Sequence, residues 1–387
     1  MTELDFGSTI TGEIAVVNKL RESAIRQGNP PGTKLLAPAA LLLCAVLGFA
    51  TVSSYNPPSA QGPNAAGFSS ARAETLLREF LGDETPHPVA TPANRRVKQR
   101  ILAQLKRFGI EAHEQRTFAC AVSWSVCAQV ENIIARIPGE KPEALLLMAH
   151  YDSVPHAPGA GDDGAGVAAV LEVARQLAKE GPHRNTLLLA ITDGEEVGLV
   201  GAEAFFGQHP AADEVAFVLD LEGSGSSGPV QLLRTGRDNR FAVQRYQAVV
   251  KDSVANSVAN EVFKHMPNDT DFSVAQRAGL QGIDLAFAGE RNHYHTVLDS
   301  VDNLDKNTLQ HHGNLLLPLA RDLLQADFSN TPTGDVVYLD WFGLQLHWGE
   351  GWSLPLIGIF VLLLVVAVAR RSSARDVARS GVRVLLA

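Results

Sequence analysis

The chain has 387 residues, of which 45% are hydrophobic, which is enough for one large domain with a buried core and further segments. Its formal net charge at pH 7 is −9, and it contains no long basic run. This balance argues against a nucleic-acid-binding protein. It is compatible with carboxylates gathered around cations.

Two uncharged apolar stretches, residues 35–53 and 352–369, predict membrane-spanning helices. Each is close to the roughly 20 residues needed to cross a bilayer. A signal peptide and a buried core helix, respectively, are the alternatives. The polar residues 1–34 precede the first stretch, whereas a signal peptide starts close to the N-terminus, so we favour an uncleaved span.

Basic residues flank the outer ends of both stretches. They are Lys19, Arg21, Arg26 and Lys34 before the first, and Arg370, Arg371, Arg375, Arg379 and Arg383 after the second. No Lys or Arg occurs from residue 35 to Arg72 or within residues 335–351. Because cytoplasmic flanks are enriched in Lys and Arg, both termini are predicted to be cytoplasmic. The region between the spans is then extracytoplasmic, in the periplasm, the cell exterior or an organelle lumen.

The chain is thereby divided into seven segments. They are a cytoplasmic tail (1–34), a transmembrane helix (35–53), a linker rich in Pro, Gly, Ser and Asn (54–66), a globular domain (67–330), a juxtamembrane segment (331–351), a second transmembrane helix (352–369) and a basic cytoplasmic tail (370–387). A longer polytopic protein that starts with this chain is equally compatible with the pattern.

Within the globular domain, helical and strand-like patterns alternate. Helices are predicted at residues 71–81, 94–108, 164–179, from 201 to 206, 241–251 and 309–324, and strands at 130–137, 144–148, 187–191, 216–221 and 230–234. This alternation predicts an α/β fold, a three-layer sandwich with a central sheet flanked by helices. Cys120 and Cys127 could close a hairpin disulfide in an oxidising compartment, or remain two buried thiols.

Five short segments carry side chains of the metal-ligand type. They are AHYDS (149–153), AGDDGAG (160–166), TDGEEVG (192–198), VLDLEG (218–223) and HYHT (293–296). The first four follow strand-like runs, and α/β sheets bind ligands beyond the carboxyl ends of their strands. A dinuclear hydrolase needs imidazole and carboxylate ligands, one bridging carboxylate and one unligated base. The set therefore indicates a two-metal hydrolase.

Several roles follow from residue type and position. His150 ends an apolar run, and Asp152 can accept its second imidazole N–H and fix its tautomer. Asp162 lies in a Gly-rich turn that suits a bridging carboxylate. Glu195 and Glu196 point in different directions, so one can bind metal while the other reaches the water.

Over about residues 90–325 these segments resemble the M28 family of zinc aminopeptidases. They are most similar to its membrane-bound branch, which includes vacuolar membrane proteases and endoplasmic reticulum metallopeptidase 1. The resemblance implies a mixed central sheet and two Zn²⁺ ions per chain. It implies that His150 and Glu222 bind one ion, that Glu196 and His295 bind the other, and that Asp162 bridges them.

The resemblance also implies that Glu195 is the general base and that Tyr294 stabilises the tetrahedral intermediate. Soluble members carry Asp where this chain has Glu222, and Asp220 is the competing candidate ligand. His293 is the alternative to His295, but in the family a His-Thr pair marks the ligand. The segment NDTDF (268–272) matches a family stretch near the substrate and receives no role.

The leading functional hypothesis is a membrane-anchored, zinc-dependent aminopeptidase that acts on peptides. One alternative is a catalytically silent binding module of the same fold, which the complete ligand set disfavours. Another is a single-zinc acyltransferase that cyclises N-terminal glutamine, which needs only one of the two ligand sets. Transport is disfavoured because neither predicted span contains an ionisable residue.

Overall fold

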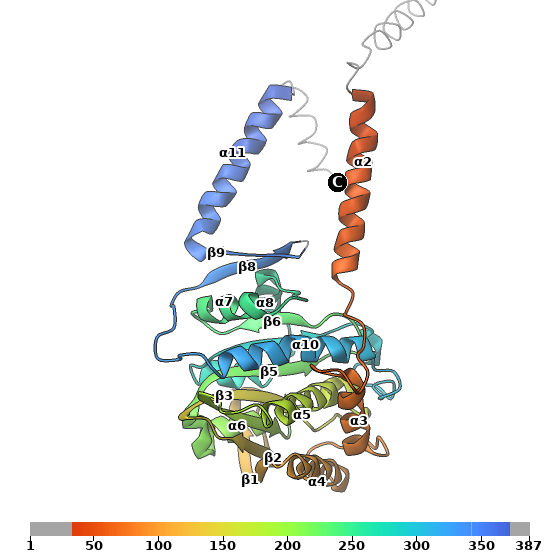
Figure 1. Ribbon diagram of the computed structural model, residues 1–387, viewed down its shortest axis with the longest axis vertical. Helices are drawn as coiled ribbons and strands as arrows, with labels where there is room; N and C mark the ends of the chain where they lie inside the picture. The colour runs from red at the N-terminus through yellow and green to blue at the C-terminus, as the bar shows by residue number, and fades with distance from the viewer. Residues whose placement is uncertain (1–32, 342, 372–387) are drawn as a thin grey trace, which may run out of the picture. The chain divides into compact units, whose positions relative to one another are not determined.

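The computed structural model describes residues 33–341 and 343–371, which divide into two units that meet between Ser54 and Tyr55 (Figure 1). The first unit contains helix α2 (Thr33–Ser54). The second contains the globular domain, a two-stranded hairpin and helix α11 (Ser353–Arg371).

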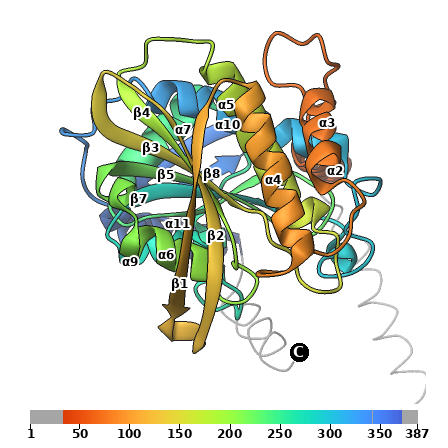
Figure 2. The ribbon, with the colours of Figure 1, turned by 90° about the horizontal axis from the view of Figure 1, so that it is seen from below.

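A seven-stranded mixed sheet forms the centre of the domain, in the order β1-β2-β4-β3-β5-β7-β6 (Figure 2). Its strands are β1 (Glu111–Ala121), β2 (Val126–Ile137), β3 (Lys141–His150), β4 (Asn185–Thr192), β5 (Val215–Gly223), β6 (Gln231–Thr235) and β7 (Gln281–Phe287). The four neighbours β4, β3, β5 and β7 are parallel to one another. Strands β1, β2 and β6 run antiparallel to their partners. The predicted mixed sheet is confirmed.

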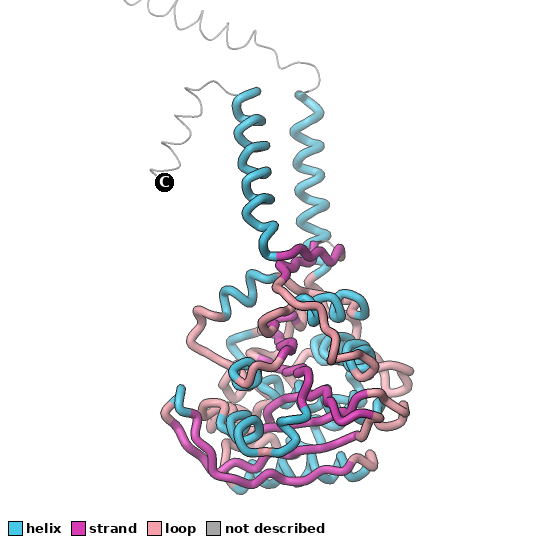
Figure 3. Tube along the Cα trace, turned by 90° about the vertical axis from the view of Figure 1, so that its left-hand side faces the viewer, coloured by secondary structure: helices cyan, strands magenta, loops and turns pink. Residues whose placement is uncertain are grey.

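Helices cover both faces of this sheet (Figure 3). One face carries α3 (Ser70–Leu81), α4 (Pro92–Arg107), α5 (Ala165–Leu177), α7 (Arg240–Val249) and α10 (Lys306–Leu323), and the other carries α6 (Val200–Gln208) and α9 (Phe272–Arg277). In β3, Leu145 and Leu147 join the first hydrophobic core, whereas Leu146 and Met148 join the second. Because both faces are buried, the central strands are continuously apolar.

The predicted helices and strands of the domain are all present, with ends shifted by a few residues. The sequence analysis missed β1, β7, α8 (Ser257–Phe263), α9 and the hairpin of β8 (Val336–Trp341) and β9 (Leu344–Gly349). Strand β1 lies at the sheet edge and exposes most of its side chains, so no apolar run marks it. In β7 the apolar pattern is interrupted by Gly282 and the buried Asp284.

Among the described helices, one at Glu350–Val368 is long and apolar enough to cross a membrane. In α2, the described residues contain the apolar stretch Leu41–Ala50. The prediction of two spans therefore stays a prediction, as do the segment boundaries and the orientation. Nearly all of the two predicted tails lies outside the described residues.

The predicted linker is bound to the domain instead of hanging free. The backbone N–H of Ala60 donates to Asn307 Oδ1 at 2.8 Å, and that of Gln61 donates to Gln310 Oε1 at 3.1 Å. Arg72 adds hydrogen bonds to the carbonyls of Pro63 and Ala65. Backbone groups that a flexible linker would leave to water are thus paired with side chains of α10 and α3.

Cys120 and Cys127 form a disulfide, so the first of the two alternatives for this pair is the one found. They are directly opposite residues of β1 and β2, close to the turn that joins these strands. Disulfides persist in oxidising compartments. The bond is consistent with the predicted extracytoplasmic domain, which remains a prediction.

A glycine in α10 is required for the packing of Phe68. A Cβ at Gly313 would lie 2.0 Å from Phe68 Cγ, whereas a Cβ at Gly207 in α6 would meet nothing within 4 Å. We expect Gly313→Ala to lower the free energy of unfolding by about 1–3 kcal/mol through overpacking. Denaturant unfolding of the solubilised protein measures the change. Gly207→Ala is the matched control, and equal stabilities of the two variants would contradict the argument.

Candidate metal centre

The topology brings the carboxyl ends of four strands to one edge of the sheet. Because β4, β3, β5 and β7 are adjacent and parallel, the segments that leave them are neighbours. His150 is the last residue of β3, and Glu222 lies at the end of β5. Glu196 follows β4, and His295 follows β7. Asp162 lies between β3 and α5.

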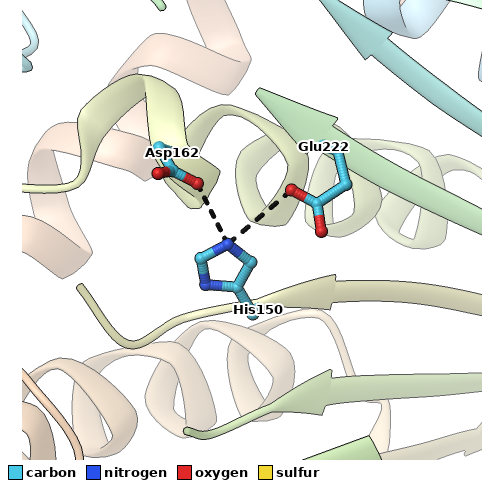
Figure 4. Close-up of side chains that lie close together, drawn as sticks. All are labelled: His150, Asp162 and Glu222. Atoms are coloured by element: carbon cyan, nitrogen blue, oxygen red, sulfur yellow. Dashed lines mark hydrogen bonds and ion pairs between the residues drawn. The ribbon is translucent and has the colours of Figure 1, made fainter. Parts of the chain in front are cut away.

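One group of three potential ligands is buried at the end of β3. His150 Nε2 lies 3.1 Å from Asp162 Oδ1 and 3.8 Å from Glu222 Oε2. Figure 4 shows the two carboxylates, one from the loop before α5 and one from β5, directed at the same edge of the imidazole ring.

A second group of three shares Asp162 with the first. His295 Nε2 lies 3.1 Å from Asp162 Oδ2 and 3.0 Å from Glu196 Oε2. The two oxygens of Asp162 therefore face different imidazoles. Although these atoms are within ion-pair distance, Asp162 Oδ2 and His295 Nε2 have no hydrogen-bond partner among the described residues.

This donor set fits divalent cations of the zinc type. Zinc bonds to imidazole nitrogen and carboxylate oxygen measure about 2.0–2.2 Å, so tetrahedral ligand atoms lie about 3.4 Å apart. The observed separations of 3.0 to 3.8 Å bracket that value. Buried polar atoms without a partner are costly, and a cation between them would satisfy them.

The charges at the site also favour a bound cation. Burial and the neighbouring Asp162 raise the pKa of Glu196 to about 8. Burial likewise raises the pKa values of Glu195 and Glu222 well above their usual range. Burial opposes protonation of His295, but the Asp162 and Glu196 carboxylates raise its pKa to about 10. Without a cation, protons hold these groups together, and a bound metal would displace them.

Asp152 acts differently from the sequence-based expectation. The backbone carbonyl of Asp152 lies 3.1 Å from His150 Nδ1 and forms the hydrogen bond, while the carboxylate Oδ1 is 3.5 Å away. The carboxylate accepts instead from the backbone N–H groups of Glu195 at 3.0 Å and Glu196 at 3.3 Å. Asp152 thus orients the imidazole through its main chain and holds the Glu195–Glu196 turn through its side chain.

The structure separates both pairs of competing candidates. Asp220 Oδ2 accepts from Phe272 N–H at 3.1 Å, whereas Glu222 Oε2 lies 3.8 Å from His150 Nε2. The Nδ1 atom of His293 lies 2.7 Å from Ser226 Oγ, whereas His295 lies at the shared carboxylate.

Tyr294 stacks on His295 with ring centroids 3.7 Å apart. Burial, together with the surrounding carboxylates, raises its pKa, which keeps the hydroxyl protonated and able to donate a hydrogen bond. It lines a cleft together with Glu195, Leu233, Phe263, Met266 and Arg291.

The sequence analysis missed Asp299. This fully buried carboxylate accepts from the backbone N–H of Gly161 at 2.6 Å and from that of Asp162 at 3.3 Å. It thereby joins the His295 segment to the loop that carries the shared ligand. The available signal was an acidic residue only four positions after His295.

The segment NDTDF, which received no role, forms part of the cleft wall. Asn268, Asp269 and Thr270 line the cleft, and Asp271 hydrogen-bonds Thr192 at the end of β4. Behind this wall lies Arg234, which is almost fully buried. It pairs with Asp284 at 2.9 Å and donates to Ser273 Oγ at 2.8 Å, so it fixes the segment from the sheet side.

A family model described as peptidase family M28 matches residues 132–320, the region that contains both ligand groups. The chain belongs to peptidase family M28. It is 33% identical over 317 residues to the vacuolar membrane protease of Eremothecium gossypii, a match that covers 75% of this chain and 30% of the relative. The corresponding protein of Lachancea thermotolerans is 36% identical over 262 residues, with 64% of this chain and 27% of the relative covered. The chain therefore spans less than a third of the length of these relatives.

Solved structures confirm the fold. A Zn-dependent exopeptidase from Parabacteroides distasonis is similar with a TM-score of 0.54 and 20% identity, over 66% of this chain and 98% of that one. The glutaminyl cyclase of Porphyromonas gingivalis has the same TM-score at 22% identity, over 67% of this chain and all of its own. At these identities the fold is shared, and the reaction has to be argued from the site.

Loss of the Asp299 carboxylate should weaken metal binding without removing a ligand. We expect Asp299→Asn to lower zinc affinity about 10- to 100-fold, because partners that orient metal ligands typically contribute that much. Competition with a chromogenic chelator measures the affinity. The exposed Asp302, three residues on, provides the control Asp302→Asn. Equal affinities of the two variants would disprove the role of Asp299.

Zinc binding should release protons. At pH 7 Glu196, with a pKa of about 8, and His295, with a pKa of about 10, hold protons that the metal must displace. We therefore expect about two protons or more to be released per chain, and zinc affinity to fall as the pH is lowered from 8. Calorimetric titration in buffers of different ionisation enthalpy counts the protons. A heat of binding independent of the buffer would contradict the assignment of these two ligands.

Proposed function

We propose that this chain carries the catalytic domain of a membrane-anchored, zinc-dependent aminopeptidase with two Zn²⁺ ions per site. The observation that carries the proposal is the pair of ligand groups that share Asp162. His150 and Glu222 complete the first group, and Glu196 and His295 complete the second. Glu195 belongs to neither group but lines the same cleft, as an unligated base must.

Bound zinc would supply a water of lowered pKa and a positive charge for the developing oxyanion. Glu195 takes the proton from the attacking water and returns it to the leaving amine. Asp152 sets the position of Glu195, since its carboxylate binds the backbone of the turn that carries the base. Tyr294 donates its hydroxyl hydrogen bond to the oxyanion, because its raised pKa keeps that proton in place.

The proposed substrates are peptides with a free N-terminus. The carboxylates around the metal centre provide partners for a protonated α-amine. The apolar side chains of Leu233, Phe263 and Met266 lie in the same cleft and provide contacts for the first side chain of the substrate. A cleft with these two features favours removal of one residue at a time.

Two alternatives remain to be tested against this proposal. A single-zinc glutaminyl cyclase has a similar fold, but it requires only one metal and leaves the second ligand group unexplained. A silent binding module requires neither group. The presence of both complete groups favours the peptidase over each of them.

Hydrolysis of a panel of aminoacyl-anilides by the full chain in detergent tests the proposal. We expect turnover that a chelator abolishes and zinc restores, and that falls about 10²- to 10⁴-fold in Glu195→Gln while bound zinc is retained. Glu203→Gln, at a carboxylate paired with Arg277, is the control.

Cyclisation of N-terminal glutamine in place of anilide hydrolysis would establish the alternative enzyme. A protein that binds no zinc would establish the silent module.

A further inference from the structure

The hairpin of β8 and β9 has one face made entirely of large apolar side chains. In its antiparallel register Val337 faces Trp348, Leu339 faces Leu346 and Trp341 faces Leu344. Directly opposed residues of an antiparallel pair project from the same face. The outer face of the hairpin thus consists of Val337, Leu339, Trp341, Leu344, Leu346 and Trp348.

The opposite face binds the globular domain. Tyr338 is 1% exposed, Gln345 Nε2 donates to the Val250 carbonyl at 2.8 Å, and His347 Nδ1 lies 2.6 Å from Gln247 Oε1. Along its edge, the Asp340 N–H donates to the Ala255 carbonyl at 2.8 Å. These contacts hold the hairpin on the domain and fix which face points away.

Three of the six outer-face residues are exposed, and Val337, Leu339 and Trp348 are half-buried. Trp341, Leu344 and Leu346 are 55%, 58% and 40% exposed. Contiguous exposed apolar surface of this kind marks an interaction site on a folded domain. Strand β9 is followed at once by η5 (Glu350–Trp352) and then by α11, the helix that is apolar and long enough to cross a membrane. Trp348 Nε1 donates to Ser353 Oγ at 3.1 Å, which ties this face to the start of that helix.

We propose that the outer face of the β8–β9 hairpin lies on the lipid surface beside α11 and docks the domain on the membrane. Trp341, Trp348 and Trp352 are residues of the kind found at the boundary of bilayer and water. No Lys or Arg occurs between Arg321 and Arg370, so the hairpin itself offers no basic side chain to anionic headgroups, and its outer face makes an apolar contact. The surface recognised is a neutral phospholipid interface.

Site-directed spin labelling of the full chain in phosphatidylcholine nanodiscs tests this docking. Labels are attached to Leu344→Cys and Leu346→Cys in a Cys44→Ser background, since Cys44 is the free cysteine of the described residues. Val122→Cys, 85% exposed on the β1–β2 turn, is the matched control for water. Ile359→Cys in α11 is the control for the bilayer interior. Collision rates with oxygen, which enters lipid, and with a nickel chelate, which stays in water, are compared.

At positions 344 and 346 we expect an oxygen-to-nickel ratio above that at 122 and below that at 359, unchanged when anionic lipid is added. A ratio equal to that at 122 would overturn the proposal. Exclusion of both reagents would overturn it too, because a protein segment or a second copy would then cover the face. An oxygen-to-nickel ratio at position 359 equal to that at 122 would show that α11 does not lie in the bilayer, and the proposal would fail. A ratio at positions 344 and 346 that depends on anionic lipid would refute a contact with neutral lipid. Zinc binding equal to that of the unlabelled chain verifies that each labelled protein is folded.

Discussion

The position of the Asp162 carboxylate between two imidazoles is the constraint on which the site depends. Its two oxygens lie 3.1 Å from His150 Nε2 and 3.1 Å from His295 Nε2, although these histidines are 145 positions apart in the chain. Such a carboxylate stays ionised in a buried place only beside positive charge, which here comes from protonated imidazoles or a bound metal ion. The buried hydrogen bonds from Gly161 and Asp162 to Asp299 keep its loop in place.

The sheet topology explains why so many acidic side chains can be gathered there. Four adjacent parallel strands deliver their carboxyl ends to one edge, and each following segment contributes ligands or their supports. The two hydrophobic cores on either side of β3 and β4 hold this edge rigid. The stability gained in these cores balances the cost of burying Glu195, Glu222 and their neighbours close together.

The sequence predicts the parts of the site that depend on local patterns. The apolar runs before His150, Glu195 and Glu222 indicate buried strands, and the position of each of these site residues after a strand follows from them. The preference for Glu222 over Asp220 rested on the family resemblance alone. Alternation places both on the same face, so periodicity could not separate them.

Long-range contacts escaped prediction for a physical reason. Asp299 acts on a loop 138 residues away, and no local pattern encodes that pairing. Asp152 was expected to bind His150 through its carboxylate, but the turn after β4 takes the carboxylate and leaves the carbonyl for the imidazole. In β8 both the domain-facing and the outward residues include apolar side chains, which hides the strand, whereas in β9 Leu344, Leu346 and Trp348 alternate with non-apolar residues, a strand signal that was overlooked.

The binding of residues 60–61 to α10 has a consequence for biosynthesis. Gln61 and its partner Gln310 are separated by 249 positions, so the ribosome must complete most of the domain before this contact can form. Until then, Phe68 cannot pack on Gly313 and α3 lacks its partner α10. Contacts of such large sequence separation slow folding. The nascent domain therefore acquires its final packing late in translation, and this interval is when it depends most on chaperones in its compartment.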